Sequence, residues 1–176
     1  MTKTSQHAAW IALGSNLGDR AAHLRGALRA LAEARGVEVV AVSRLHETEP
    51  LGPTQGRYLN AAAQLRTSLR PRELLELLHA IEAQAGRERG PVRWAARTLD
   101  LDLLFYDDAC LEEPDLVVPH PRLHERSFVL EPLREIAANL VHPKLGATVA
   151  ELAERVRERE VARPCVGEEA AWRSRR

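Results

Sequence analysis

The chain has 176 residues, 45% of them apolar and 28% charged, which is the composition of one globular domain with a hydrophobic core. Its 25 basic and 25 acidic residues cancel to a net charge of zero, so strong electrostatic attraction to nucleic acid or to an anionic membrane is not expected. No apolar stretch approaches the roughly 20 residues of a membrane-spanning helix, residues 1–7 are too polar for a secretory signal, and two cysteines are too few for a disulfide framework or a Cys-based metal site. We expect a cytoplasmic, reduced, monomeric protein.

The first part of the chain alternates strand-like and helix-like segments. Residues 8–13 are a short apolar run, as in a buried strand, and apolar residues recur at helical spacing over 20–34. The β-branched run 37–42 predicts a second strand. After a loop rich in Pro and Gly over 50–56, alternate apolar residues over 58–65 predict a third strand.

The second part begins with a helix predicted over 71–86, with Pro in its first turn and Gly at its end. Residues 99–106 predict the fourth strand, and 128–138 another helix. A capping box of Thr and Glu opens a last helix expected over 148–160, whereas 161–176 lack periodicity and predict a flexible tail. This order of elements predicts an α+β sandwich, a mostly antiparallel sheet covered by helices.

The fourth predicted strand carries two acids at alternate positions. Asp100 and Asp102 should project from one face, while Leu99, Leu101 and Leu103 face the core. Because strands disfavour Asp and two neighbouring carboxylates repel each other, a cation should compensate them. One interpretation is a magnesium site, since Mg2+ binds one or two carboxylates together with phosphates and water. The alternative is a solvated strand end whose acids pair with nearby arginines.

Arginines are concentrated just before this acidic pair. Arg is planar, always charged and bidentate toward phosphate oxygens, so a metal with converging arginines suits transfer of a polyphosphate group. A solvated loop is the competing interpretation, because Lys occurs only twice in the chain and Arg supplies nearly all of its positive charge. The four arginines are Arg87, Arg89, Arg93 and Arg97.

The glycine pair at 14 and 18 surrounds a strand-to-helix turn. It is a weak match to a phosphate-binding loop, and no Gly-rich loop with Lys of the Walker type is present in the sequence. We expect Ser15 or Asn16 to cap the following helix instead.

Several segments, taken in order, are similar to one family. They are residues 11–18 (IALGSNLG), 47–53 (ETEPLGP), 58–62 (YLNAA), 93–102 (RWAARTLDLD) and 118–121 (VPHP). Together they resemble the 6-hydroxymethyl-7,8-dihydropterin pyrophosphokinase family of folate biosynthesis. The similarity extends from about residue 9 to residue 146, which is most of the chain.

This resemblance implies an activity and a fold. The family transfers pyrophosphate from ATP to the hydroxymethyl oxygen of the pterin and releases AMP. Asp100 and Asp102 match acids that hold two Mg2+ ions, and Arg87 and Arg97 match arginines that stabilise charge on the transferred group. The implied fold is a ferredoxin-like α+β sandwich, which we assign to residues 8–160. The implied partners are therefore small molecules, ATP as co-substrate and the pterin.

The resemblance also assigns binding residues. Tyr58 and Phe128 match an aromatic pair that sandwiches the pterin ring, although packing in the core is the ordinary role of such side chains. Asn60 can donate and accept hydrogen bonds at once, which suits the amide-like edge of a pterin. Glu82 corresponds to a position near the adenosine, with an ordinary surface glutamate as the alternative. The full pterin set is Thr48, Leu51, Tyr58, Asn60, Trp94 and Phe128. The nucleotide set is His79, Glu82, Arg89, Arg93, Trp94, Arg97, His120 and Arg126.

Four positions depart from the family pattern. Ala95-Ala96 stands where many members have Gly-Pro, Glu49 where Pro is frequent, His79 where Gln is expected, and Pro121 where an aromatic residue is frequent. We expect these differences to change affinity and loop motion rather than the type of reaction.

Two other functions are less consistent with the sequence. A nucleotidyltransferase with a Gly-Ser turn and an Asp-x-Asp strand needs the turn close before the acids, whereas Ser15 is far from Asp100 in the chain. A ferredoxin-like module that binds RNA or a regulatory ligand is disfavoured by the 4% aromatic content.

Overall fold

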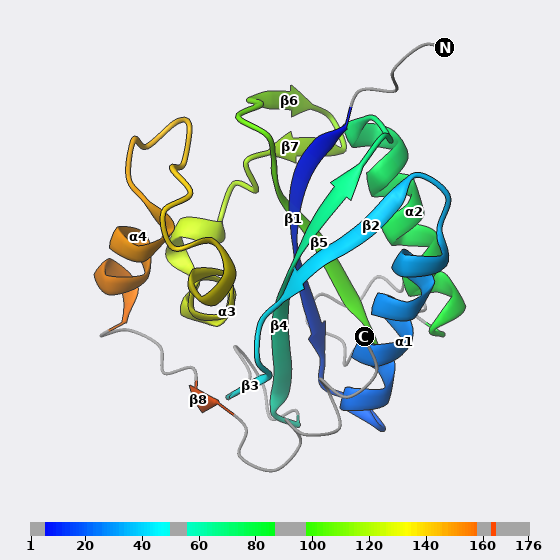
Figure 1. The fold of residues 1–176 in the computed structure, drawn as a ribbon. Coiled ribbons are helices and arrows are strands. Elements are labelled where there is room, and N and C mark those ends of the chain that lie inside the picture. Colours follow the sequence, from blue (N-terminus) through cyan, green and yellow to red (C-terminus); the bar gives the residue numbers. More distant parts are fainter. Residues whose placement is uncertain (1–5, 50–55, 87–97, 158–162, 165–176) are drawn as a thin grey trace, which may run out of the picture.

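The structure is a computed structural model that describes residues 6–49, 56–86, 98–157 and 163–164. An antiparallel sheet lies between two pairs of helices, with α1 and α2 on one face and α3 and α4 on the other (Figure 1). The elements are β1 (His7–Ser15), α1 (Arg20–Glu33), β2 (Val37–Val42), β3 (His46–Thr48), β4 (Tyr58–Thr67), α2 (Pro71–Gln84), β5 (Asp100–Tyr106), β6 (Leu111–Glu113), β7 (Leu116–Val118), the 3-10 turn η1 (Leu123–Glu125), α3 (Ser127–Ala137), α4 (Val149–Val156) and β8 (Arg163–Pro164).

The strands of the main sheet follow the order β5-β1-β4-β3-β8, and β2 pairs with β4 next to β3. All of these pairings are antiparallel in the described part of the chain. A separate hairpin joins β6 to β7. The expected mixture of helices with a mostly antiparallel sheet is thus confirmed. No helix of the described segments has the length and apolar character needed to span a membrane.

The longer predicted elements are confirmed with small changes at their ends. The last helix begins after the predicted capping box at Thr148, but it ends at Val156 rather than near residue 160. The sequence did not indicate β3, β6, β7, β8 or η1, because segments of two or three residues are too short to show a period. Within the expected tail the structure describes only Arg163–Pro164, which pairs as β8 with β3.

The face of the sheet under α1 and α2 carries the main apolar core. Ile11 of β1 and Leu65 of β4 have no exposed surface, and neither do Leu24 of α1 and Leu78 of α2, which pack in the same cluster. Full burial of each such side chain stabilises the fold by about 1.5–3 kcal/mol.

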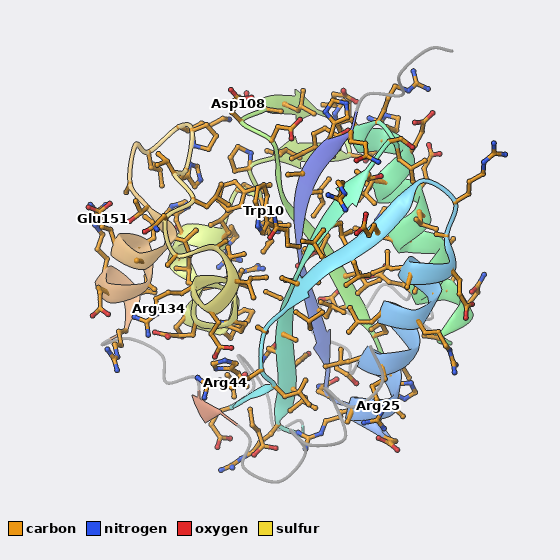
Figure 2. All side chains as sticks on the ribbon, viewed as in Figure 1. Trp10, Arg25, Arg44, Asp108, Arg134 and Glu151 are labelled. Atoms are coloured by element: carbon orange, nitrogen blue, oxygen red, sulfur yellow. The ribbon has the colours of Figure 1, made fainter. Side chains whose placement is uncertain are left out.

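The opposite face is divided into two halves. One half is apolar, because Trp10, Leu104 and Phe105 pack against Leu130 of α3 and Val149 of α4. Figure 2 shows Trp10 on this side of the sheet, toward α3. In the other half, toward the end of β1 and the start of β5, the strands carry polar side chains. The candidate site occupies that polar half.

Candidate functional site

Antiparallel pairing places residues of separate strands in one row across the polar half. Gly14 of β1 lies between Asp100 of β5 and Asn60 of β4, and Asn60 in turn pairs with His46 of β3. Asp102 lies two residues further along β5, opposite Ala12 of β1. The sheet therefore brings the predicted metal-binding acids and the predicted pterin-binding amide to the two sides of one glycine.

The absence of a side chain at Gly14 matters in this row. A Cβ there would lie 3.3 Å from Asn60 Oδ1 and 4.0 Å from Asp100 Cβ. The first distance is tighter than an ordinary van der Waals contact, so any larger residue would crowd the amide. Because Gly14 has no side chain, the surface of the sheet between Asn60 and Asp100 stays open.

The turn after Gly14 differs from the sequence prediction. Ser15 still belongs to β1, where it pairs with Leu59, and both Ser15 and Asn16 are buried. The cap of α1 is Asp19, whose Oδ1 accepts a hydrogen bond of 2.9 Å from the backbone N–H of Ala22. The prediction that Ser15 or Asn16 caps the helix is therefore wrong, because the strand continues further than the apolar run suggested.

The alternation predicted for β5 is confirmed. Leu101 and Leu103 belong to the core under α1 and α2, so Asp100 and Asp102 face the other side. Glu82 supports this arrangement from α2, because its Oε1 accepts a hydrogen bond of 2.7 Å from the backbone N–H of Leu101. Glu82 is only 1% exposed. Its interpretation as a surface glutamate is wrong, and its carboxylate instead holds the edge strand between the two acids.

The acids are suited to a divalent ion that is shared with a substrate. Among the described residues no group of three or more His, Cys, Asp or Glu could hold a metal ion. Mg2+ needs no such group, since it commonly takes one or two carboxylates and completes its shell with substrate phosphates and water. Asp100 and Asp102, on one face of one strand, provide that oxygen donor set. The donors therefore fit Mg2+ in the presence of a phosphorylated substrate.

A cationic side chain borders the acids. Arg126 Nη1 lies 4.0 Å from Asp102 Oδ2, and its side chain is 22% exposed. Burial lowers the pKa of the Arg126 guanidinium, and the charge of Asp102 opposes that shift. The guanidinium nevertheless remains charged at neutral pH. Its Cζ lies 5.7 Å from the ring centroid of Phe128, a cation–π contact that fixes both side chains on the same side of the site.

His120 is a neutral group at the same site. Burial lowers the pKa of His120 to about 4, with the charge of Arg126 acting in the same direction and Asp100 opposing it. The backbone N–H of Arg122 donates to His120 Nδ1 over 3.2 Å, so the ring proton belongs on Nε2. At neutral pH His120 can therefore donate a hydrogen bond without adding positive charge.

The predicted pterin residues meet at the paired ends of β3 and β4. Thr48 lies opposite Tyr58, and Asn60 Nδ2 donates a hydrogen bond of 2.9 Å to Thr48 Oγ1. Both partners in this bond are buried. Phe128 lies in the first turn of α3, which covers this face of the sheet. The described part of the predicted pterin set thus shares one face.

Several predicted residues lie outside the described part of the chain. They are Leu51, Arg87, Arg89, Arg93, Trp94 and Arg97, and their roles stay predictions. His79 is described in α2, one turn before Glu82. Of the positions that depart from the family pattern, Glu49 forms an ion pair of 2.6 Å with Arg57.

The sequence placed Gly14 in a turn and in a family-like segment but gave it no role at the site, and it did not single out His46 or Glu135. Gly14 is marked only by its place in the row, which depends on pairing with two distant strands. His46 bonds to Glu135 of α3, and its strand is too short to be recognised from sequence. For Gly14, the motif at residues 11–18 was the signal in the sequence that could have indicated a role at the site.

Comparison with known proteins gives a family match. Residues 10–138 match the family described as 7,8-dihydro-6-hydroxymethylpterin-pyrophosphokinase (HPPK). A 2-amino-4-hydroxy-6-hydroxymethyldihydropteridine pyrophosphokinase from Synechocystis is 45% identical over 150 residues, which cover 85% of this chain and 76% of the relative. A protein of the same name from Bacillus subtilis is 50% identical over 129 residues, covering 73% of this chain and 77% of the relative.

A solved structure is similar in fold. The crystal structure of Plasmodium falciparum HPPK-DHPS matches with a TM-score of 0.71 at 16% sequence identity. The match covers 88% of this chain but only 45% of that chain. At this identity the likeness concerns the fold alone, and it extends to less than half of the longer protein.

Proposed function

The chain belongs to the 7,8-dihydro-6-hydroxymethylpterin-pyrophosphokinase family, and we propose that it transfers pyrophosphate from ATP to 6-hydroxymethyl-7,8-dihydropterin. Membership makes it a pyrophosphotransferase. The products would be AMP and the pyrophosphorylated pterin, an intermediate of folate biosynthesis. The observation that carries the proposal is the row of Asp100, Gly14 and Asn60 across three strands. It places a carboxylate, the acidic end of the site, and an amide, its amide end, on either side of a residue that has no side chain.

The amide end would bind the pterin. Asn60 can donate and accept in the plane of its amide, and its bond to Thr48 orients it. Tyr58 and Phe128 would lie against the two sides of the ring, where stacking and removal of water both favour binding. Gly14 would let the ring approach the sheet backbone, since a methyl group there would meet Asn60.

The acidic end would receive the triphosphate. Asp100 and Asp102 would hold Mg2+, which when bound would offset phosphate charge and lower the pKa of the attacking hydroxyl. Arg126 brings a fixed positive charge to this end, next to Asp102. Neutral His120 could donate from Nε2 to a phosphate oxygen. With the pterin hydroxymethyl group directed toward the acids, attack would occur on the β-phosphorus and AMP would leave.

Further roles follow from the family resemblance. Arg87 and Arg97 would stabilise charge on the transferred group, and the other predicted nucleotide residues would contact ATP. We also propose that the domain extends over residues 8–160 and is a ferredoxin-like sandwich. The order of elements from β1 to β5 and the strand order β5-β1-β4-β2 support this classification. We also propose that the protein is a cytoplasmic monomer, and its low cysteine content is consistent with a reducing compartment.

Analysis of the nucleotide product tests the proposal. The protein is mixed with ATP, Mg2+ and 6-hydroxymethyl-7,8-dihydropterin, and the nucleotides and pterins are separated by chromatography. We expect AMP and pyrophosphorylated pterin in equal amounts, and neither product when the pterin is omitted. ADP in place of AMP would contradict transfer of pyrophosphate. A folded protein that binds ATP but forms no product would favour a binding module instead.

A further inference from the structure

The strands β2 and β3 are separated by an irregular step that faces the candidate site. Both pair with β4, Val42 opposite Ala63 and His46 opposite Asn60. From the first pair to the second, the chain advances four residues on the side of β2 and β3 but only three along β4. One extra residue is therefore inserted, which is the definition of a β-bulge.

This bulge decides which way β3 faces. Val42 and Leu45 are three positions apart, yet both are buried in the core under α1 and α2. In a regular strand such positions would lie on opposite faces. Because of the extra residue, His46 and Thr48 turn to the other face, where Asn60 and α3 lie. Without the bulge, Thr48 would point away from the candidate pterin pocket.

Glu135 of α3 holds the bulge. Its Oε2 accepts a hydrogen bond of 2.8 Å from the backbone N–H of Arg44, so a side chain satisfies this donor where the strand is interrupted. Its Oε1 accepts hydrogen bonds from Arg44 Nε at 3.0 Å and from His46 Nε2 at 2.8 Å. Burial raises the pKa of Glu135, but the hydrogen bonds from Arg44 and His46 outweigh it and hold the pKa below its ordinary value. Figure 2 shows Arg44 below α3, next to β3.

His46 depends strongly on this carboxylate. Its side chain is 5% exposed, and its Nδ1 is buried without a hydrogen-bond partner among the described residues. The ring is therefore oriented by the bond from Nε2 to Glu135. Since His46 pairs with Asn60 across the strands, its orientation affects the packing beside that amide.

We infer that Glu135 is a positioning residue for the pterin pocket: by holding the bulge between β2 and β3, it turns Thr48 toward Asn60 and fixes β3 relative to α3. Phe128 lies two turns before Glu135 on the same helix, so the same anchor sets the distance from Phe128 to the β3–β4 pair. The role rests on the proposed function, because it concerns the pocket assigned there to the pterin. It predicts an effect on the pterin and not on ATP.

Replacement of Glu135 by Gln tests this role. In E135Q an NH2 group replaces one carboxylate oxygen. The amide can therefore accept fewer of the hydrogen bonds from Arg44 and His46, and its NH2 group would face their N–H donors. We expect the KM for the pterin to rise about tenfold, while the KM for ATP changes less than about twofold. The control is E131Q, which lies one turn earlier on α3, is similarly buried, and pairs with Arg134 of the same helix. E131Q should leave both KM values unchanged.

A second pair of variants separates positioning from general stability. H46Q keeps a donor for Glu135 and should retain much of the pterin affinity, whereas H46L should raise the KM for the pterin as E135Q does. This pair also serves if E135Q does not fold. Equal KM values for the pterin in E135Q and E131Q, or in H46L and the wild type, would overturn the positioning role alone. A wild type that forms no product would overturn the proposed function and this role with it.

Discussion

The two faces of the sheet use the same strands for different purposes. Toward α1 and α2, the inward positions of β1, β4 and β5 are mostly apolar, and these apolar side chains form one buried core. Toward α3 and α4, the same strands are apolar for only part of their length and then carry Asn60, Asp100 and Asp102. In this part of each strand, one residue therefore packs in the core and the next residue belongs to the polar surface.

This difference shows how the fold can maintain a costly polar surface. Two carboxylates and a buried amide on a sheet offer little packing energy, and the acids repel each other. The core beneath them supplies the stability, because Leu101 and Leu103 fix β5 from the other side. Substitutions on the first face should thus reduce stability, and substitutions in the polar half should reduce activity.

The largest expected effect concerns the acidic pair. Asp102→Asn should lower kcat by about a thousandfold, roughly 4 kcal/mol in the barrier, because a neutral amide holds the cation poorly. The side chain is 37% exposed and the change preserves its shape, so the thermal midpoint should stay within a few degrees. Steady-state kinetics and thermal unfolding on one preparation measure both. Near-normal turnover would contradict the assignment of Asp102.

Leu65→Ala tests the opposite face of the sheet, the one under α1 and α2. Leu65 has no exposed surface and lies in the core under α1 and α2. Its truncation should lower the free energy of unfolding by about 2–5 kcal/mol, because a cavity is left in a packed core. Below the unfolding temperature, kcat should remain within about twofold of the wild type. Urea unfolding and kinetics at low temperature test this, and a loss of turnover without a loss of stability would break the division between the faces.

The buried, neutral side chain of His120 makes the stability of the fold depend on pH. The pKa of His120 is lowered to about 4 by burial, compared with an ordinary value of 6.5. Between these values the unfolded chain binds a proton that the folded chain does not, so stability falls as pH decreases from 6.5 to 4. His120→Asn removes this contribution. From pH 7 to pH 4.5 the wild type should lose about 1–3 kcal/mol more than the variant in urea unfolding. Equal losses would show that His120 is not buried as a neutral group.

The smallest expected effects come from two glycines. Gly14→Ala should raise the KM for the pterin about fivefold, because the new methyl group would lie 3.3 Å from Asn60 Oδ1. Gly26→Ala is the control, since a Cβ there meets nothing within 4 Å in the middle of α1. It should raise stability by about 0.5–1 kcal/mol and leave the kinetics unchanged. If both variants have the same KM for the pterin, the space at Gly14 is not needed for pterin binding.

The sequence predicted those features that depend on local patterns. The period-two alternation of leucines with Asp100 and Asp102 was enough to place both acids on one face. The spacing of apolar residues likewise located α1 and α2, and the Thr148 capping box located the start of α4. Such patterns repeat over several residues, so they can be recognised without knowledge of the tertiary structure.

Features that depend on contacts between distant segments could not be predicted in this way. The burial of Glu82 follows from its bond to Leu101 of another element. The orientation of the Thr48 side chain depends on a bulge that is stabilised by Glu135, a residue distant in the sequence. The capping by Asp19, in place of Ser15, follows from the pairing of β1 with β4 up to its last residue. In each case tertiary contacts override the local signal.

The proposed function requires the polar half of the sheet to bind both the pterin and the triphosphate. Chemical shifts of backbone amides, measured with Mg2+, a non-hydrolysable ATP analogue and 6-hydroxymethyl-7,8-dihydropterin, test it most directly. We expect the largest changes at β3, at the start of β4, at the start of β5 and in the first turn of α3. Changes concentrated on the outer surfaces of α1 and α2, with none at Asn60 or Asp100, would contradict it.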